Sequence, residues 1–452
     1  MAARLYNGAM AIDICIRGSG VVGKTLALLL ARKRIRVGLV QSPVLVHSAA
    51  TAQADIRAFA LNAASRAALT GLRAWPQQAC AVQHIRVQGD RDDSPPDADT
   101  SADTHADTHA DTHIRATKSA RTNAGAGRVQ FDAASLQAEA LAWIVDAAAL
   151  ETLLDTAVSF APDITLLSAP QPAVLTVICE GARSASRQIA GVEFTQTAYD
   201  QTAIAAVVQT SAPHQSTAWQ WMQGGEVCAL LPRQASLDQT SPGQAGNFVA
   251  LVWSVQTEHA AQLMALDDAQ FCAQLQQACD HMLGTMTLAS HRATWPLQLA
   301  QAQRWVGTGL AAAAGNAADN TAAWALAGDA AHAVHPLAGQ GLNLGLGDAI
   351  GLATVLSNKE YFRSFGDMRL LRRYERARQG EAAALRLATD GLQRLFAHTD
   401  PRVRALRNWG MRGFDALAPV KALVMRRAMG GSAGGSMGGS MGGGGHGLSG
   451  NI

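Results

Sequence analysis

A glycine-rich turn between two apolar runs is the feature that most constrains the fold. The run "IDICI" (12–16) precedes "GSGVVGKT" (18–25), which leads into a helical pattern and then into a second apolar run, "RVGLV" (36–40). Two short apolar runs joined by a helix are typical of a βαβ unit, in which the strands are parallel. The sequence therefore predicts an α/β fold that opens with such a unit.

The turn itself matches two different phosphate-binding motifs. In one interpretation Gly18, Gly20 and Gly23 form a dinucleotide fingerprint, with a tight turn, close backbone approach to a pyrophosphate and close packing of helix on strand. In the other, the turn is a phosphate loop in which Lys24 contacts the β- and γ-phosphates and Thr25 a magnesium ion. Neither match is specific by itself.

A second glycine-rich stretch, "GDAAHAVHPLAGQGLNLGLGDA" (328–349), favours the dinucleotide interpretation. An extended cofactor must be held at both ends, and glycines let backbone N–H groups approach a flat ring. A magnesium-binding Asp329 would need neither this loop nor the helix expected to start near Asn343. A metal site at Asp329, His332 and His335 is not predicted, because no companion carboxylate–histidine cluster occurs elsewhere.

Composition limits the class of protein. A chain of 452 residues with 48% hydrophobic residues is long enough for two or three domains with a sizeable core. Its six cysteines include no CxxC pair, which predicts neither a disulfide framework nor a zinc site and fits a reducing cytoplasm. No charged N-terminal region precedes an apolar stretch, and "LALLLA" (26–31) is too short to cross a bilayer, so we expect a cytoplasmic protein.

Two segments are expected to be disordered or flexible. The tandem repeat "ADTSADTHADTHADTH" (98–113) has no apolar residues except alanine and lies between two candidate strands, "QHIRVQGD" and "GRVQFDA". We interpret it as an expanded hairpin loop. The segment 430–452, rich in Gly, Met and Ser, is expected to be a flexible tail.

The rest of the chain divides into a β-rich and a helical part. Residues 192–253 contain β-like runs, whereas 361–427 is helical and rich in arginine. Residues 359–429 carry sixteen Lys and Arg against seven Asp and Glu. Such a basic segment is commonly a solvated helix face, and the alternative is peripheral contact with anionic lipid or an acidic partner. No feature indicates nucleic-acid binding.

These motifs together resemble a known family. The stretches "GSGVVG", "DIRAFALNAASRAAL" (55–69), "AWIVDAAALETLL" (142–154), "WPLQL" (295–299) and the 328–349 run closely resemble the flavin-dependent aromatic hydroxylases, and within them the bacterial ubiquinone-biosynthesis hydroxylases. The resemblance implies a Rossmann-like FAD-binding domain interrupted by a β-sheet substrate domain and followed by C-terminal helices. The expected boundaries are 1–73, 129–190 and 296–358 for the FAD-binding domain, 74–128 and 191–295 for the substrate domain, and 359–429 for the helices.

The resemblance also implies roles for individual residues. The N-terminal glycines would hold the ADP half of FAD, Arg57 would lie beside the cofactor, and Asp329 would bind the ribityl chain or pyrophosphate. His335 and Pro336 would border the reactive face of the flavin. The residues implied to bind FAD are Gly18, Gly20, Gly23, Gln41, Arg57, Asp329, Gly339, Gln340, Gly341 and Asn343.

The implied activity is hydroxylation of the ring of a polyprenyl phenol in ubiquinone biosynthesis, using FAD, NAD(P)H and O₂. Other proteins of that pathway, or a second copy of the chain, are possible partners. Two positions depart from the family pattern: Gln41 replaces an acidic residue at the adenosine ribose, and Glu180 replaces an aspartate before Gly181. They leave open a non-catalytic structural subunit, and the phosphate-loop motif leaves open an NTPase.

Overall fold

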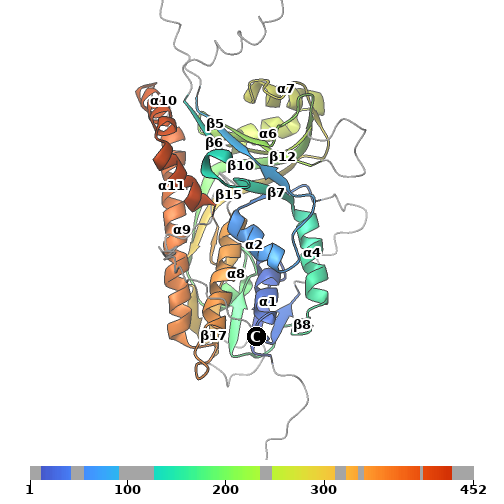
Figure 1. The fold of residues 1–452 in the computed structure, drawn as a ribbon, viewed down its shortest axis with the longest axis vertical. Coiled ribbons are helices and arrows are strands. Elements are labelled where there is room, and N and C mark those ends of the chain that lie inside the picture. Colours follow the sequence, from blue (N-terminus) through green and yellow to red (C-terminus); the bar gives the residue numbers. More distant parts are fainter. Residues whose placement is uncertain are drawn as a thin grey trace, which may run out of the picture.

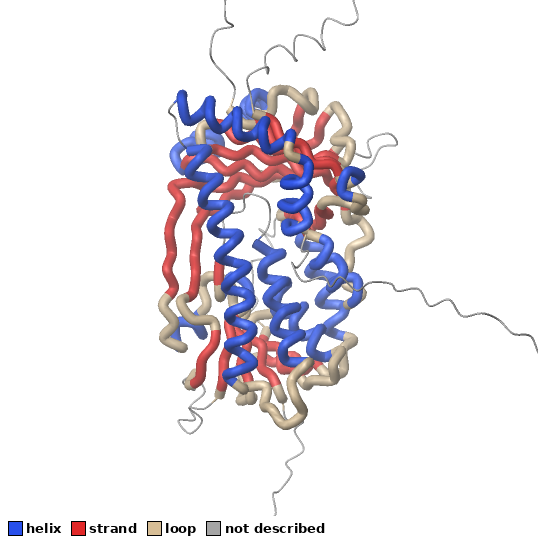
Figure 2. Tube along the Cα trace, turned by 60° about the vertical axis from the view of Figure 1, so that its left-hand side comes forward, coloured by secondary structure: helices blue, strands red, loops and turns tan. Residues whose placement is uncertain are grey.

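The computed structural model describes residues 12–41, 55–90, 127–234, 247–310, 322–333, 341–397 and 401–429. Two large sheets organise these residues. A mainly parallel six-stranded sheet with its helices forms one end, and a nine-stranded sheet forms the other (Figure 1). The long helix α9 (Met368–Ala397) runs along the side of the molecule from one end towards the other (Figure 2).

The six-stranded sheet contains the predicted βαβ unit. Its order is β16-β17-β9-β1-β2-β8, and β1 lies near the middle, paired in parallel with β2 and β9. Only the β16–β17 pair is antiparallel. The strands are β1 (Ile14–Arg17), β2 (Val37–Val40), β8 (Ile164–Leu167), β9 (Leu175–Ile178), β16 (Val306–Thr308) and β17 (Ala323–Leu326).

Four helices pack beside this sheet in the lower part of Figure 1. The apolar helix α1 contacts α4 on one side and α8 on the other. Helix α2 begins after Asn62, whose side-chain oxygen accepts a hydrogen bond from the Ser65 N–H at 2.9 Å and so caps the helix. The helices are α1 (Val21–Ala31), α2 (Ala63–Gly71), α4 (Ala147–Ser159) and α8 (Gly341–Ser357).

The nine-stranded sheet contains the β-like runs predicted from sequence. Its order is β18-β15-β10-β13-β12-β11-β5-β6, and β14 pairs with β10. Strands β5 and β6 are antiparallel neighbours, as the hairpin interpretation requires, and the 98–113 repeat lies outside the described residues. The strands are β5 (His84–Gln88), β6 (Arg128–Asp132), β10 (Phe194–Thr210), β11 (Thr217–Gln223), β12 (Glu226–Arg233), β13 (Phe248–Gln256), β14 (Met286–Leu288), β15 (Ala293–Ala302) and β18 (His332–Ala333).

The two faces of the nine-stranded sheet have different partners. On one face, Ile204 and Trp253 pack against Phe271 of α7, next to α6. On the other, Leu231 and Ala250 pack against a three-stranded sheet of order β3-β7-β4. These elements are α6 (Thr257–Ala265), α7 (Asp268–Ala278), β3 (Ala58–Leu61), β4 (Cys80–Val82) and β7 (Ala142–Asp146).

The C-terminal helices cover one edge of the nine-stranded sheet. The side chain of Asp415 in α10 accepts a hydrogen bond from the Gln130 N–H of edge strand β6 at 3.0 Å, and Met425 of α11 packs against Ala133 and Leu141. The edge strand is therefore partly satisfied within the chain. The remaining elements are α5 (Ala185–Ile189), α10 (Pro401–Ala416), α11 (Ala418–Ala428) and the short 3₁₀ turns η1 (Ala134–Leu136) and η3 (Gly328–Ala330).

One ion pair joins the nine-stranded sheet to the three-stranded sheet, and its contribution to stability can be tested. Arg233 of β12 donates two hydrogen bonds to Asp146 of β7, at 2.7 and 2.8 Å, and both side chains are largely buried. We predict that Arg233→Met lowers the free energy of unfolding by about 2 kcal/mol, because the Asp146 carboxylate loses its charged partner. Urea denaturation of the full chain measures the change.

A surface ion pair provides the control. Arg34, 83% exposed, reaches Asp163 at 3.5 Å. Arg34→Met should change stability by less than about 0.5 kcal/mol. Equal effects of the two substitutions would show that the Arg233–Asp146 pair does not join the sheets.

Candidate functional site

The predicted fingerprint forms a tight turn after β1. Gly18 has a φ of 108°, and a Cβ on it would lie 2.4 Å from the Cys179 carbonyl oxygen. A Cβ on Gly23 would lie 2.0 Å from the Gly18 carbonyl oxygen, so α1 can approach β1 this closely only without a side chain there. Around Gly20, in contrast, no described atom lies within 4 Å of a Cβ position. The first turn of α1 is thus open to an anionic ligand.

The same turn does not suit a phosphate loop. The Lys24 amino group lies 2.6 Å from the Asp155 carboxylate of α4, and the Lys24 side chain is almost fully buried there. Thr25 is completely buried within α1, and its hydroxyl has no hydrogen-bond partner among the described residues. Neither side chain is placed to contact a nucleotide phosphate or its magnesium ion, so the dinucleotide interpretation fits better.

Three other predicted positions lie at the same edge of the sheet. Because β1, β2, β9 and β17 are parallel, the residues that follow them gather at one edge. Gln41 follows β2, where its N–H donates to the Leu167 carbonyl at 2.9 Å and its side chain is exposed. Glu180 follows β9, and Asp329 follows β17 within η3.

Asp329 lies in a surrounding that favours a ligand. Its side chain is accessible to solvent, yet enough protein lies around it that loss of hydration raises the pKa of the carboxyl above its usual value. The charge of His332 opposes this rise in pKa, and Asp348 adds to it. The carboxylate is exposed at the carboxyl edge of the sheet, where it could accept a hydrogen bond from a cofactor hydroxyl.

Helix α8 contributes its N-terminal turn to this edge. A Cβ on Gly345 would lie 3.3 Å from the Gly328 Cα, which places the start of α8 beside η3. Around Gly341 no described atom lies within 4 Å of a Cβ position. The N–H groups of a first helical turn lack acceptors within the helix, so they can bind polar groups of a flavin ring.

Asn343 has a role that its sequence position does not reveal. Its side-chain oxygen accepts hydrogen bonds from the Asn62 N–H and the Ser65 hydroxyl, both at 2.9 Å, and its side-chain amide donates to the Ala60 carbonyl at 2.7 Å. The side chain therefore joins α8 to the start of α2. Its backbone N–H is the group left for a cofactor.

Arg57, predicted to lie beside the cofactor, forms ion pairs with neighbouring carboxylates. The Arg57 guanidinium is half-exposed and forms ion pairs with Asp55 at 2.6 Å and Glu151 at 3.5 Å. Hydrogen bonding to Asp55 raises the pKa of Arg57, so it stays a cation beside two carboxylates. The predicted residues outside the described part of the chain are His335, Pro336, Gly339 and Gln340.

Glu180 has local hydrogen-bond partners. Its carboxylate accepts from the Ser184 hydroxyl at 2.7 Å and from the Ser186 N–H and hydroxyl at 2.9 and 2.5 Å. These bonds place the carboxylate at the N-terminus of α5, where a negative charge is favoured. Glu180 thus stabilises a turn and a short helix.

A buried charged cluster behind η3 is absent from the sequence prediction. Asp348 of α8 is completely buried and bonds to the Gly328 N–H at 2.9 Å, to His332 Nε2 at 2.7 Å and to Arg378 Nε at 2.8 Å. The one available signal was a carboxylate in the apolar run "LGLGDAIGLA", which requires a partner if that helix is buried.

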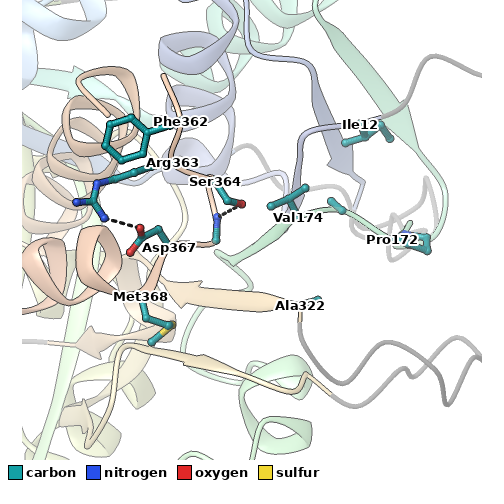
Figure 3. Close-up of a pocket in the computed structure, with 11 residues that line it drawn as sticks. Ile12, Pro172, Val174, Ala322, Phe362, Arg363, Ser364, Asp367 and Met368 are labelled. Atoms are coloured by element: carbon teal, nitrogen blue, oxygen red, sulfur yellow. Dashed lines mark hydrogen bonds and ion pairs between the residues drawn. The ribbon is translucent and has the colours of Figure 1, made fainter. Parts of the chain in front are cut away.

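A surface hollow of about 770 Å³ lies at the opposite edge of the parallel sheet (Figure 3). It is lined by Ile12, Val174 and Ala322, which precede β1, β9 and β17, and by Phe362 and Met368. Ligands of open parallel sheets bind outside the carboxyl ends of the strands. The hollow is therefore separate from the edge that carries Gly18 and Asp329.

Metal-ligating clusters and membrane-spanning helices are both absent from the described residues. Within the described ranges no group of three or more His, Cys, Asp or Glu side chains could hold a metal ion. Among those same residues no helix is long and apolar enough to cross a membrane.

Comparison with known proteins agrees with this geometry. Residues 11–388 match the family described as FAD binding domain. The chain belongs to this FAD-binding family. FAD is accordingly its cofactor, and the resemblance to the flavin-dependent ubiquinone-biosynthesis hydroxylases is confirmed.

Individual relatives and a solved structure are similar to this chain. Mouse ubiquinone biosynthesis monooxygenase COQ6, mitochondrial, is 31% identical over 286 residues, which cover 56% of this chain and only 55% of that protein. The 3-demethoxyubiquinol 3-hydroxylase of Escherichia coli K12 is 27% identical over 92% of this chain and 98% of its own length. The fold is similar to p-nitrophenol 4-monooxygenase PnpA of Pseudomonas putida DLL-E4, with a TM-score of 0.61, 15% identity and coverage of 93% and 96%.

Replacement of Asp329 is predicted to weaken FAD binding and to raise the Tm of the FAD-free protein. In the FAD-binding chain, Asp329→Asn should weaken FAD binding about tenfold, since one charge-assisted hydrogen bond is worth about 1.5 kcal/mol. It should also raise the Tm of the FAD-free protein at neutral pH, because the charged carboxyl is poorly hydrated in the folded state. Flavin fluorescence titration and thermal unfolding measure the two effects.

The pH dependence of the Tm gain follows from the raised pKa of the Asp329 carboxyl. A carboxyl whose pKa is raised on folding destabilises the fold above that pKa, and this cost disappears as the pH falls through it. The Tm gain of Asp329→Asn should therefore shrink on acidification.

Asp163→Asn at the amino edge of the sheet is the control for both the FAD titration and the thermal unfolding. Unchanged FAD affinity in Asp329→Asn would remove Asp329 from the site.

Proposed function

We propose that the chain is an FAD-dependent monooxygenase that uses NAD(P)H and O₂ to hydroxylate the aromatic ring of a polyprenyl phenol in ubiquinone biosynthesis. The observation that carries this proposal is the meeting of two glycine-rich segments, about Gly18 and Gly341, at the carboxyl edge of one parallel sheet. An extended cofactor such as FAD must be held at both ends, which two such segments can do, and the ubiquinone-biosynthesis relatives support the substrate class.

In this proposal the backbone holds the cofactor and the side chains define its surroundings. The N-terminus of α1 binds the pyrophosphate, Gln41 the adenosine ribose, and Asp329 a hydroxyl of the ribityl chain. The first turn of α8 holds the ring, with His335 and Pro336 at its reactive face. FAD, once reduced by NAD(P)H, supplies the oxygen chemistry.

An apolar wall on the nine-stranded sheet supports the exclusion of water. Ala205 and Val207 of β10 and Phe248 of β13 pack against Ile56, with Trp295 beside them. Ile56 directly precedes Arg57 and the strand that reaches Asn62, so the wall adjoins the elements that meet α8. Except for Trp295, these side chains are buried, and such an apolar cluster would exclude water from that side of the reaction and favour an apolar ring substrate near it.

A non-catalytic structural subunit is the alternative, for which Gln41 and Glu180 gave the motive. The hydrogen bonds of Glu180 to the start of α5 give that residue a local structural role, which supports the enzyme over the subunit. Incubation with NAD(P)H, ¹⁸O₂ and a prenylated phenol in detergent distinguishes the two. Substrate-dependent NAD(P)H oxidation with one ¹⁸O atom in the ring supports the enzyme, and absence of both supports the subunit.

Gln41 gives a prediction about cofactor affinity. A carboxylate can accept bonds from both ribose hydroxyls, and charge-assisted hydrogen bonds are roughly twice as strong as neutral ones. Gln41→Glu should therefore tighten FAD binding several-fold, by about 1 kcal/mol, without changing the product. Titration of the FAD-free protein measures this. Unchanged or weaker binding would mean that Gln41 does not contact the ribose.

The C-terminal helices support peripheral contact with anionic lipid. Trp409 of α10 and Val420 and Val424 of α11 are exposed apolar side chains, and Arg426 is exposed beside them. Apolar anchors together with cations bind anionic interfaces. We predict sedimentation with vesicles containing phosphatidylserine at low salt but not with phosphatidylcholine vesicles.

The control for the vesicle experiment removes the apolar anchors and keeps the charges. A Val420→Ser, Val424→Ser variant should lose most of the binding to phosphatidylserine vesicles. Equal sedimentation of the wild-type chain with both vesicle types would contradict lipid contact by these helices.

A further inference from the structure

Asp348 joins three separate elements from the interior. One carboxylate oxygen accepts from the Gly328 N–H of η3 and from His332 Nε2, at 2.9 and 2.7 Å. The other accepts from Arg378 Nε of α9 at 2.8 Å. Asp348 is itself in α8, so a single buried side chain fixes η3, β18 and α9 relative to that helix.

The charge on Asp348 is maintained by its partners. Complete burial by itself would raise the pKa of Asp348, but the charges and hydrogen bonds of His332 and Arg378 hold it below its usual value. Tyr374, also close by and buried, donates its hydroxyl to the Leu326 carbonyl at 2.8 Å. A buried carboxylate destabilises the fold when it lacks partners. Removal of one partner of Asp348 should therefore shift the carboxylate and its remaining partners.

The cluster holds the turn that carries Asp329 within narrow limits. Gly328 has a φ of 64°, and a Cβ on it would lie 3.2 Å from the Val22 side chain of α1. A Cβ on Gly345 of α8 would lie 2.8 Å from the same side chain. The turn is thus packed between the helix whose N-terminus is open to phosphate and the helix that carries Asp348.

A second buried cation holds the same turn from the other side. Arg187 of α5 donates to the Ala330 carbonyl at 3.0 Å and to the Ala182 carbonyl at 2.7 Å. Asp329 therefore lies between Gly328, fixed by Asp348, and Ala330, fixed by Arg187. Buried side chains on either side of Asp329 determine its position.

Helix α9 reaches the same place through three residues. Besides Arg378, Glu375 accepts a hydrogen bond from the Trp305 N–H at 2.7 Å, and Tyr374 contacts the end of β17. The Trp305 ring stacks on His332, with centroids 4.8 Å apart and planes 22° from parallel. The docking of α9 is thereby connected to the residues that hold η3.

We propose that Asp348 is a positioning residue for FAD, which sets the place of Asp329 through the Gly328 N–H and His332 and makes FAD affinity depend on the docking of α9 through Arg378. The inference rests on the proposed contact of Asp329 with FAD. It assigns Asp348 no contact with the cofactor and predicts that its effect on affinity passes through Asp329 and not through the first turn of α8.

A double-mutant cycle on the full chain tests this directly. FAD dissociation constants are measured by flavin fluorescence for Asp348→Asn, Asp329→Asn and the double variant, well below their melting temperatures. Asp348→Asn should weaken binding several-fold, and by no more than the roughly tenfold loss of Asp329→Asn, because its effect passes through the Asp329 contact. The double variant should bind as weakly as Asp329→Asn alone. Once the Asp329 carboxylate is absent, displacement of its turn removes no further contact with FAD. Additive losses, or an unchanged dissociation constant in Asp348→Asn, would overturn the inference.

Controls separate positioning from general destabilisation. Leu275→Ala opens a cavity in α7, on the face of the nine-stranded sheet away from α9, where Leu275 is completely buried. It should lower the Tm and leave the FAD dissociation constant within twofold. A matching loss of FAD affinity in Leu275→Ala would assign the effect of Asp348 to stability alone.

A second pair of variants serves if Asp348→Asn does not fold. His332→Gln keeps a donor for the Asp348 carboxylate and should bind FAD nearly as wild type, whereas His332→Leu removes the donor and should bind at least several-fold more weakly. Equal affinities of the two would contradict the inference. Failure of the FAD site is distinguishable, because Asp329→Asn would then bind FAD as tightly as wild type.

Discussion

Close backbone contact at the carboxyl edge of the six-stranded sheet is the constraint on which the rest of the structure depends. Gly23 lies against the Gly18 carbonyl, and Gly345 lies against Gly328, so α1 and α8 both meet the edge without intervening side chains. This contact brings segments some three hundred positions apart in the sequence into one site. The buried core around the six-stranded sheet holds the starts of α1 and α8 in place.

The division of labour within the site follows from that constraint. Where we propose that the backbone approaches the cofactor, side chains are absent, as at Gly20 and Gly341. Fixed charges therefore lie behind the turn: Asp348 and Arg187 are buried and bond to backbone atoms next to Asp329. The nine-stranded sheet adds an apolar surface, and the pair of Arg233 with Asp146 joins that sheet to the three-stranded sheet.

Sequence reasoning succeeded where a local pattern determines the structure. The glycine spacing from Gly18 to Gly23 and the flanking apolar runs predicted the βαβ unit, because a tight turn requires those residues whatever surrounds it. The antiparallel β5–β6 pair and the helical C-terminal part follow from local periodicity in the same way. The cofactor was predicted from the combination of two glycine-rich segments and the family they resemble.

Roles that depend on distant neighbours could not be predicted. Asn343 was expected to hold the flavin through its backbone, which remains a prediction, but the bonds of its side chain to Asn62 and Ser65, more than 270 positions earlier in the chain, were not foreseen. Asp348 was overlooked because its partner Arg378 lies on another helix, and Glu180 was interpreted as a defect because its bonds to Ser184 and Ser186 were not foreseen. In each case the chemistry of a polar side chain is set by tertiary contacts.

The central claim is that the two glycine-rich segments hold the two ends of one FAD molecule, and a crystal structure of the FAD complex tests it most directly. The account predicts the pyrophosphate at the N-terminus of α1 beside Gly20, and the flavin ring at the N-terminus of α8 beside Gly341, with Asp329 between them. Density for FAD at the hollow lined by Ile12, Val174 and Phe362, or at any place away from either helix N-terminus, would contradict it.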